Sequence, residues 1–255
     1  MLLQLVPSAH AEERIGVFML HGKNPGSNSD PGLNRLKSAF ESAGMLTAMP
    51  DMPWSRRRYL DGNWDKAMAE ITAGVTALRS QGATRIVLVA QSIGVPATLS
   101  FAARGGDVQA LVLLSPGHVP LRFYSTPNNR TVHDSVDEAR AMVAAGKGDS
   151  RESFSDINQG RKLSVTATAK DYLSYFDPTS DAEMSVTAPR VPATTPVMTV
   201  IGDDDPAFRT VRADVVDRLP ANPKSQYLEV KASHFTTPTA ASDDVLKWIK
   251  ATLAP

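Results

Sequence analysis

A serine, an acidic cluster and a histidine are the residues of this chain whose types and order suit nucleophilic chemistry. Ser92 lies in the sequence AQSIG, Asp205 ends the acidic run of GDDDP, and His234 lies in KASHF. A serine hydroxyl becomes a strong nucleophile when a histidine accepts its proton and a carboxylate orients that histidine. The set therefore predicts acyl-transfer chemistry at Ser92, against the alternative that a serine in front of a helix serves only as its cap.

The elements that must position these residues follow from the hydrophobic pattern. Six apolar runs predict strands, at residues 14–20, 45–50, 85–90, 110–115, 195–202 and 225–230. Helical spacing of apolar residues separates them, at 33–43, 64–78, 94–104, 207–218 and 243–253. Strands that alternate with helices favour a mostly parallel sheet flanked by helices, the α/β class. Ser92, Asp205 and His234 each follow a strand, so they are expected at one edge of the sheet, where its strands end.

This order and placement resemble the α/β-hydrolase family, whose nucleophile lies in a G-x-S-x-G turn followed along the chain by an acid and a histidine. Ala90 replaces the first glycine of that motif, and Gly94 keeps the second. The resemblance extends from residue 14 to residue 253, apart from an insertion. It implies that Ser92 attacks a carbonyl, that His234 transfers the proton and that Asp205 orients the imidazole.

Two neighbouring aspartates compete for the role of the acid. The family often places it three residues after a strand-ending glycine, which fits Gly202 and Asp205, but Asp203 and Asp204 remain alternatives.

The resemblance also implies an oxyanion hole and a pocket. The backbone N–H groups of Lys23 and Ile93 are the expected oxyanion donors, and His21 is expected to brace the loop beside them. Trp54 and His118 are candidates for lining the substrate pocket.

Residues 116–192 interrupt the alternation of strands and helices. No strongly buried strand is expected there, and helices are predicted at 136–145, with a capping box from Ser135 to Glu138, and at about 166–176. We expect one domain over 12–255 in which 116–192 form a helical cap over the pocket.

Composition excludes several classes of function. The chain has 255 residues, of which 42% are hydrophobic, and 27 basic residues balance 27 acidic ones. This balance argues against a nucleic-acid partner. The chain has no cysteine, which excludes disulfides and thiolate metal sites. The sequence has no group of three or more histidines or carboxylates at the spacing of metal ligands, so no metal and no cofactor are expected. No apolar run reaches the roughly 20 residues of a membrane span.

The N-terminal residues 1–11 contain the pattern Ala9-His10-Ala11, which is typical of a signal-peptidase site. They are interpreted as a remnant of an export signal, which would make the protein periplasmic or secreted, or as a simple lead-in, which would leave it cytoplasmic.

The expected function is hydrolysis of a small-molecule carboxylic ester through an acyl-enzyme, as in a carboxylesterase. A thioesterase or an acyltransferase would use the same three residues. A hydrolase-like binding protein without activity is the alternative from another class.

Overall fold

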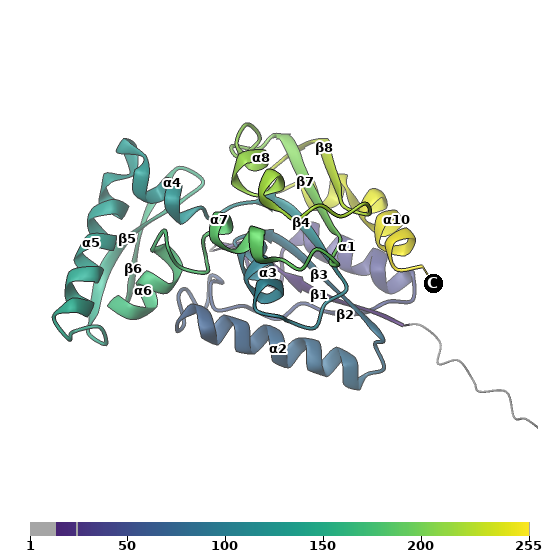
Figure 1. Cartoon of the computed structure of the whole chain (residues 1–255), viewed down its shortest axis with the longest axis horizontal. Helices are drawn as coiled ribbons and strands as arrows, with labels where there is room; N and C mark the ends of the chain where they lie inside the picture. Colours follow the sequence, from purple (N-terminus) through teal and green to yellow (C-terminus); the bar gives the residue numbers. More distant parts are fainter. Residues whose placement is uncertain (1–13, 24, 255) are drawn as a thin grey trace, which may run out of the picture.

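A six-stranded sheet forms the centre of the part of the chain that the computed structural model describes, residues 14–23 and 25–254 (Figure 1). All neighbouring strands are parallel, in the order β2-β1-β3-β4-β7-β8. The strands are β1 (Ile15–Leu20), β2 (Leu46–Ala48), β3 (Arg85–Ser92), β4 (Ala110–Pro116), β7 (Val197–Asp204) and β8 (Gln226–Ser233). Each of the six predicted strands is present.

Helices cover both faces of this sheet because its buried strands are apolar on both sides. In β1, Val17 and Met19 pack toward α1 (Pro31–Ser42) and α10 (Ser242–Thr252). The alternate residues Phe18 and Leu20 pack toward the opposite face. That face is covered by α2 (Trp64–Ser80) and α3 (Gly94–Ala103).

We call the segment between β4 and β7 the insertion. Its residues 120–176 form a lobe at one side of the sheet, whereas residues 184–190 pack against α3 (Figure 1). Its elements are α4 (Pro120–Ser125), the 3-10 turn η1 (Pro127–Asn129), α5 (Arg130–Ala144), β5 (Arg151–Asn158), β6 (Arg161–Thr168), α6 (Ala169–Phe176), α7 (Met184–Thr187) and the 3-10 turn η2 (Ala188–Arg190). The expectation of a purely helical segment was wrong, because β5 and β6 form an antiparallel hairpin.

The hairpin is joined by the two residues Gln159 and Gly160, whose φ angles are 51° and 73°. Two consecutive positive φ angles define the tight turn that matches the twist of a hairpin. The buried residues of β5 are Phe154, the polar Asp156 and Ile157, so the strand lacks a clear hydrophobic alternation.

Three helix boundaries differ from the prediction. Helix α5 begins at Arg130, and Ser135 is not its cap, since its Oγ accepts a hydrogen bond from the backbone N–H of Ser155 in β5. Helix α6 begins three residues late because β6 extends to Thr168. The helix predicted over 207–218 is reduced to α8 (Val211–Asp214) and the 3-10 turn η3 (Val216–Arg218).

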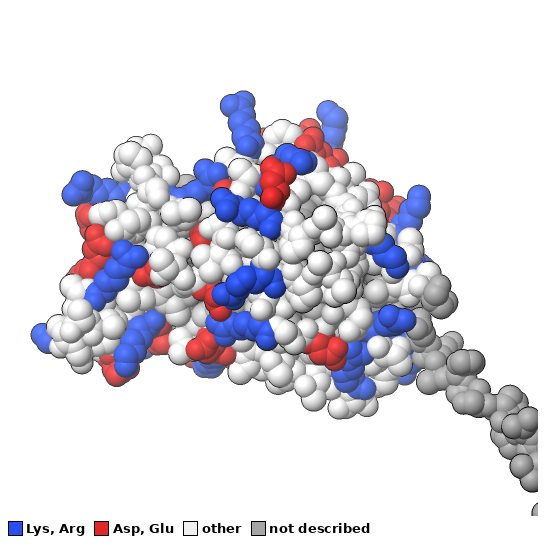
Figure 2. All heavy atoms as spheres, in the orientation of Figure 1, with Lys and Arg blue, Asp and Glu red and all other residues white. Residues whose placement is uncertain are grey.

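Charges of both signs are interspersed over the face seen in Figure 2. Among the described residues, no helix is both long and apolar enough to cross a bilayer. The predicted lead-in or signal remnant at 1–11 lies outside the described residues.

Candidate active site

Ser92 is held on a sharp turn between β3 and α3. It ends β3 with a φ of 56°, a left-handed conformation that non-glycine residues rarely adopt. Helix α3 starts two residues later at Gly94, where an added Cβ would lie 2.8 Å from the carbonyl oxygen of Leu20. Gly94 therefore allows α3 to approach the end of β1. Ala90 lies within β3 and is fully buried, so its methyl group is accommodated in the core.

His234 and Asp205 form a buried hydrogen-bonded pair. The Nδ1 of His234 lies 2.8 Å from the Oδ2 of Asp205, and both side chains are almost fully buried. The other carboxylate oxygen of Asp205 accepts the N–H of Ala207 at 2.8 Å. Although burial alone would raise the pKa of Asp205, the hydrogen bonds that its carboxylate accepts, chiefly from His234 and also from Ala207, outweigh burial and lower the pKa. Asp205 is therefore the ionised partner that suits Nδ1–H of a histidine.

Asp203 and Asp204, the alternative acids, are both exposed. Asp203 accepts the backbone N–H of Ala232 and lies 4.0 Å from the ammonium of Lys231. Of the three aspartates, Asp205 is the one in contact with His234.

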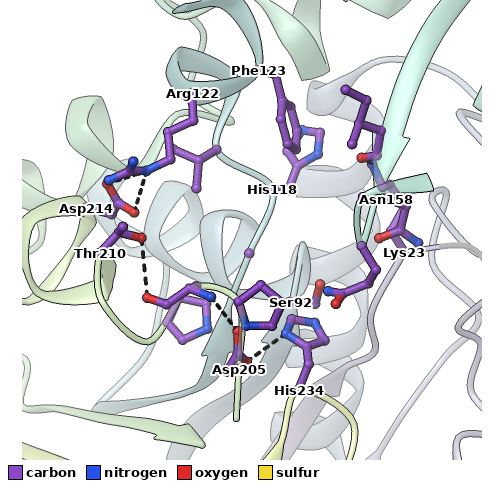
Figure 3. Close-up of a pocket in the computed structure, with 18 residues that line it drawn as sticks. Lys23, Ser92, His118, Arg122, Phe123, Asn158, Asp205, Thr210, Asp214 and His234 are labelled. Carbon is purple, nitrogen blue, oxygen red and sulfur yellow. Dashed lines mark hydrogen bonds and ion pairs between the residues drawn. The ribbon is translucent and has the colours of Figure 1, made fainter. Parts of the chain in front are cut away.

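Ser92 and His234 face the same small space beside Gly117 (Figure 3). A Cβ added at Gly117 would lie 3.0 Å from the Oγ of Ser92 and 3.4 Å from Cε1 of the His234 ring. Both side chains are thus within reach of a single reacting group. The absence of a side chain at Gly117 keeps that space open.

The loop after β1 runs beside Ser92. A Cβ at Gly22 would lie 3.4 Å from the Cβ of Ser92, so the loop runs directly beside the serine. Among the described residues, neither the N–H of Lys23 nor that of Ile93 has a hydrogen-bond partner. Two free N–H groups next to a buried hydroxyl have the composition of an oxyanion hole.

His21 braces this loop, in the position that the sequence indicated. Its Nε2 accepts the N–H of Met52 at 2.9 Å, so Nδ1 carries the proton and donates to the carbonyl of Gly22 at 2.7 Å. Burial lowers the pKa of His21, which keeps the ring neutral. The Nε1–H of Trp54 donates to the carbonyl of His21 at 2.8 Å.

Trp54 does not line the cavity, in contrast to its prediction as a pocket residue. Its fully buried indole packs behind the loop, 6.1 Å from the Trp64 ring. The physical reason is its hydrogen bond to His21, which directs the indole toward the core.

The side chain of Lys23 forms an ion pair with the insertion. Its ammonium lies 2.7 Å from the Oδ1 of Asp156 and donates to the carbonyl of Ile157 at 3.0 Å. Both charged side chains are nearly inaccessible, at 3% and 0% exposure. Burial lowers the pKa of Lys23 and raises that of Asp156, and their mutual attraction opposes both shifts.

A cavity of about 270 Å³ opens above Ser92 between the sheet and the insertion (Figure 3). Its lining residues are Lys23, Ser92, Pro116, Gly117, His118, Val119, Arg122, Phe123, Ile157, Asn158, Gln159, Gly160, Asp205, Pro206, Ala207, Thr210, Asp214 and His234. Ser92, Asp205 and His234 thus share this cavity with the turn of the β5–β6 hairpin. The cavity is therefore built jointly by the sheet edge and the insertion.

His118, the other candidate for lining a substrate pocket, lies in the wall of this cavity and has a backbone φ of 62°. Its Nε2–H donates to the carbonyl of Tyr175 at 2.7 Å, while its buried Nδ1 has no partner among the described residues. Burial, helped by the nearby charge of Lys23, lowers the pKa of His118 well below its ordinary value. The ring is a neutral part of the wall.

Arg122 and Asp214 join the insertion to the core at the cavity lining. The Nε and Nη2 of Arg122 on α4 both donate to the carboxylate of Asp214 on α8, at 2.7–3.0 Å. This pair and the partner role of Asp156 were missed by the sequence reasoning. Only the Gln159-Gly160 step, a turn signal between two alternating runs, could have indicated the hairpin that carries Asp156.

Comparison with known proteins identifies solved structures with a similar fold. No family model matches the sequence, and the search of curated proteins also found no match. Among solved structures, Est1E from Butyrivibrio proteoclasticus is 18% identical with a TM-score of 0.64, covering 98% of this chain and 92% of that one. A monoacylglycerol lipase from Paleococcus ferrophilus is 17% identical with a TM-score of 0.64, covering 93% and 94%.

A third similar structure comes from work on the metagenome-derived lipolytic enzymes LipS and LipT, at 16% identity and a TM-score of 0.63, covering 94% of both chains. Together with the parallel six-stranded sheet, these likenesses show that the chain has the α/β-hydrolase fold.

Proposed function

We propose that this protein is a serine hydrolase that cleaves carboxylic esters of small molecules through an acyl-enzyme. The observation that carries the proposal is the buried 2.8 Å hydrogen bond between His234 and Asp205, next to a serine held at positive φ. A structural serine cap needs neither a strained backbone nor a buried histidine–carboxylate pair beside it. The esterase and lipase names of the similar structures support the same class of reaction.

In the proposed reaction, the Oγ of Ser92 attacks the ester carbonyl while Nε2 of His234 accepts the hydroxyl proton. The carbonyl oxygen becomes an oxyanion that the N–H groups of Lys23 and Ile93 stabilise. Collapse of this intermediate breaks the bond to the alcohol oxygen, which takes the proton from His234. Water then repeats the sequence on the acyl-enzyme and releases the acid. Asp205 stays ionised and stabilises the imidazolium.

The cavity favours a short acyl or alcohol group. Its volume of about 270 Å³ is slightly below the range of small-molecule sites, which span roughly 300–1,000 Å³. The wall includes the apolar side chains of Val119, Phe123 and Ile157, which suit a hydrocarbon group better than a charged one.

The test is hydrolysis of p-nitrophenyl esters from acetyl to palmitoyl by the wild type and by Ser92→Ala. We expect the highest kcat/KM with acyl chains of a few carbons. We expect no turnover by Ser92→Ala, because loss of the nucleophile costs about a millionfold in kcat in enzymes with such a triad. Circular dichroism should show that the variant is folded.

Two results would contradict the proposal. Retention of near-wild-type hydrolysis by Ser92→Ala would remove the serine from the reaction. Failure of a fluorophosphonate to label Ser92 in a wild type that also hydrolyses no ester would favour a binding protein without activity.

A further inference from the structure

Lys23 connects the candidate oxyanion hole to the insertion through two parts of one residue. Its backbone N–H lies in the loop beside Ser92, and its ammonium is bound inside the insertion. Asp156 and Ile157, which accept from the ammonium, lie in β5, 133 and 134 residues further along the chain. A contact so distant in sequence fixes the loop only when the insertion is correctly docked.

The insertion holds the ammonium from several sides. The Oδ1 of Asp156 accepts from both the ammonium of Lys23 and the backbone N–H of Ile157, which orients the carboxylate. The rings of Phe123 and Phe176 each lie 5.5 Å from the ammonium, within the range of cation–π attraction. The tip of the Lys23 side chain is therefore fixed in position.

Backbone hydrogen bonds anchor the described part of the loop both before and after Lys23. His21 is fixed through its ring and its carbonyl, by Met52 and Trp54. After it, the carbonyl of Lys23 accepts the N–H of Gly26 at 2.8 Å, and the carbonyl of Gly26 accepts the N–H of Arg56 at 3.0 Å. The hydrogen bonds of its ammonium to Asp156 and Ile157 tie Lys23 itself directly to β5.

Stability alone does not explain this pair. Removing two charges from water costs several kcal/mol per ion, and apolar replacement of a buried pair is often neutral or stabilising, as a general finding. A Lys–Asp pair that is this deeply buried next to the reacting groups is better explained by precise positioning.

We propose that Asp156 is a positioning residue that, through the Lys23 side chain, aims the Lys23 backbone N–H at the oxyanion. This inference rests on the proposed function. The insertion thereby has a part in the chemical step as well as in lining the cavity. Undocking of β5 would misalign one of the two oxyanion donors without moving Ser92, His234 or Asp205.

The main test compares Asp156→Asn with Asp181→Asn. Asp181 is the matched control because it also joins the insertion to the core, by an ion pair with Arg104 at 2.7 Å, but does not line the cavity. With p-nitrophenyl acetate, Asp156→Asn should lower kcat about tenfold, less than the 10²–10³-fold loss typical of a deleted oxyanion donor, with KM changed less than twofold. Asp181→Asn should leave both parameters unchanged.

The double variant Lys23→Met/Asp156→Leu separates positioning from folding. It removes both charges at similar volume, so its unfolding midpoint in urea should match or exceed that of Asp156→Asn. Under the proposal, its kcat stays low because no side-chain hydrogen bond holds residue 23 in position. A double variant that is stable and has the wild-type kcat would overturn the proposal.

Amide hydrogen exchange of the peptide that contains Lys23 gives a readout independent of turnover. Exchange should be faster in Asp156→Asn than in the wild type and unchanged in Asp181→Asn. Unchanged exchange in Asp156→Asn would overturn the proposal, as would faster exchange with an unaltered kcat. If the wild type hydrolyses no ester, the proposed function fails, and faster exchange would still support the anchoring of Lys23 by Asp156.

Discussion

At the scale of single residues, the three aspartates of the GDDDP sequence have the same side chain but different surroundings. Asp205 is buried and hydrogen-bonded to His234, whereas Asp203 and Asp204 face solvent. The sequence could narrow the acid to this cluster and prefer Asp205 by its spacing from Gly202. It could not establish the contact with His234, which depends on how β7 and β8 lie side by side.

We expect Asp205→Asn to lower kcat by about 10⁴-fold, because an amide oriented toward the ring holds the imidazole in the wrong tautomer and cannot stabilise imidazolium. Asp203→Asn and Asp204→Asn should stay within about threefold of the wild type, a margin chosen because exposed polar changes are generally mild. Steady-state hydrolysis of p-nitrophenyl acetate checks the ranking. A larger loss in Asp204→Asn than in Asp205→Asn would move the acid to Asp204.

At the scale of elements, the turn between β3 and α3 needs small residues for different reasons at its two ends. A Cβ at Gly94 would lie 2.8 Å from both the Cβ and the carbonyl oxygen of Leu20, so the backbone would have to shift. Ala90 already carries a methyl group that packs in the core.

Gly94→Ala should therefore lower the free energy of unfolding by about 1–3 kcal/mol, the usual cost of overpacking, and should also lower kcat by shifting Ser92. Ala90→Gly is the matched control. It should cost only about 0.5–1 kcal/mol, from backbone entropy, and leave kcat unchanged. Urea unfolding and ester hydrolysis of both variants provide the measurements. Equal effects of the two substitutions would show that the approach of α3 to β1 is not tight.

The elements differ in how far sequence alone predicts them. The strands of the sheet are apolar on both faces, so β1, β3, β4 and β7 stand out as continuous hydrophobic runs. The β5–β6 hairpin was missed because its outer face is polar and its inner face includes Asp156. Asp156 is polar, so the hydrophobic pattern gives no indication that it is buried. Its partner Lys23 lies 133 residues away along the chain.

At the scale of the whole molecule, burial of neutral histidines links stability to pH. His118 is enclosed by the insertion, and burial lowers its pKa well below the ordinary value of 6.5. The unfolded chain binds a proton below that value and the folded chain does not, so the free energy of unfolding must fall as the pH decreases through this range. His21, whose pKa burial also lowers, contributes in the same direction.

His118→Asn removes one of these groups, and asparagine tolerates the positive φ at this position. Between pH 7 and pH 5.5, the free energy of unfolding should fall by roughly 1 kcal/mol less in the variant than in the wild type. Urea denaturation at the two pH values measures this difference. An identical pH dependence in both proteins would mean that the His118 ring accepts a proton in the folded state.

The turn at Gln159-Gly160 has a consequence for how this molecule can change over evolutionary time. The turn and its neighbours Ile157 and Asn158 form one wall of the cavity, and they lie outside the strands of the six-stranded sheet. Lengthening a surface turn costs little, about 0.6 kcal/mol for each doubling of its length. Insertions and deletions there can reshape the cavity and be inherited without disturbing the sheet, so new ligand preferences can arise on an unchanged chemical centre.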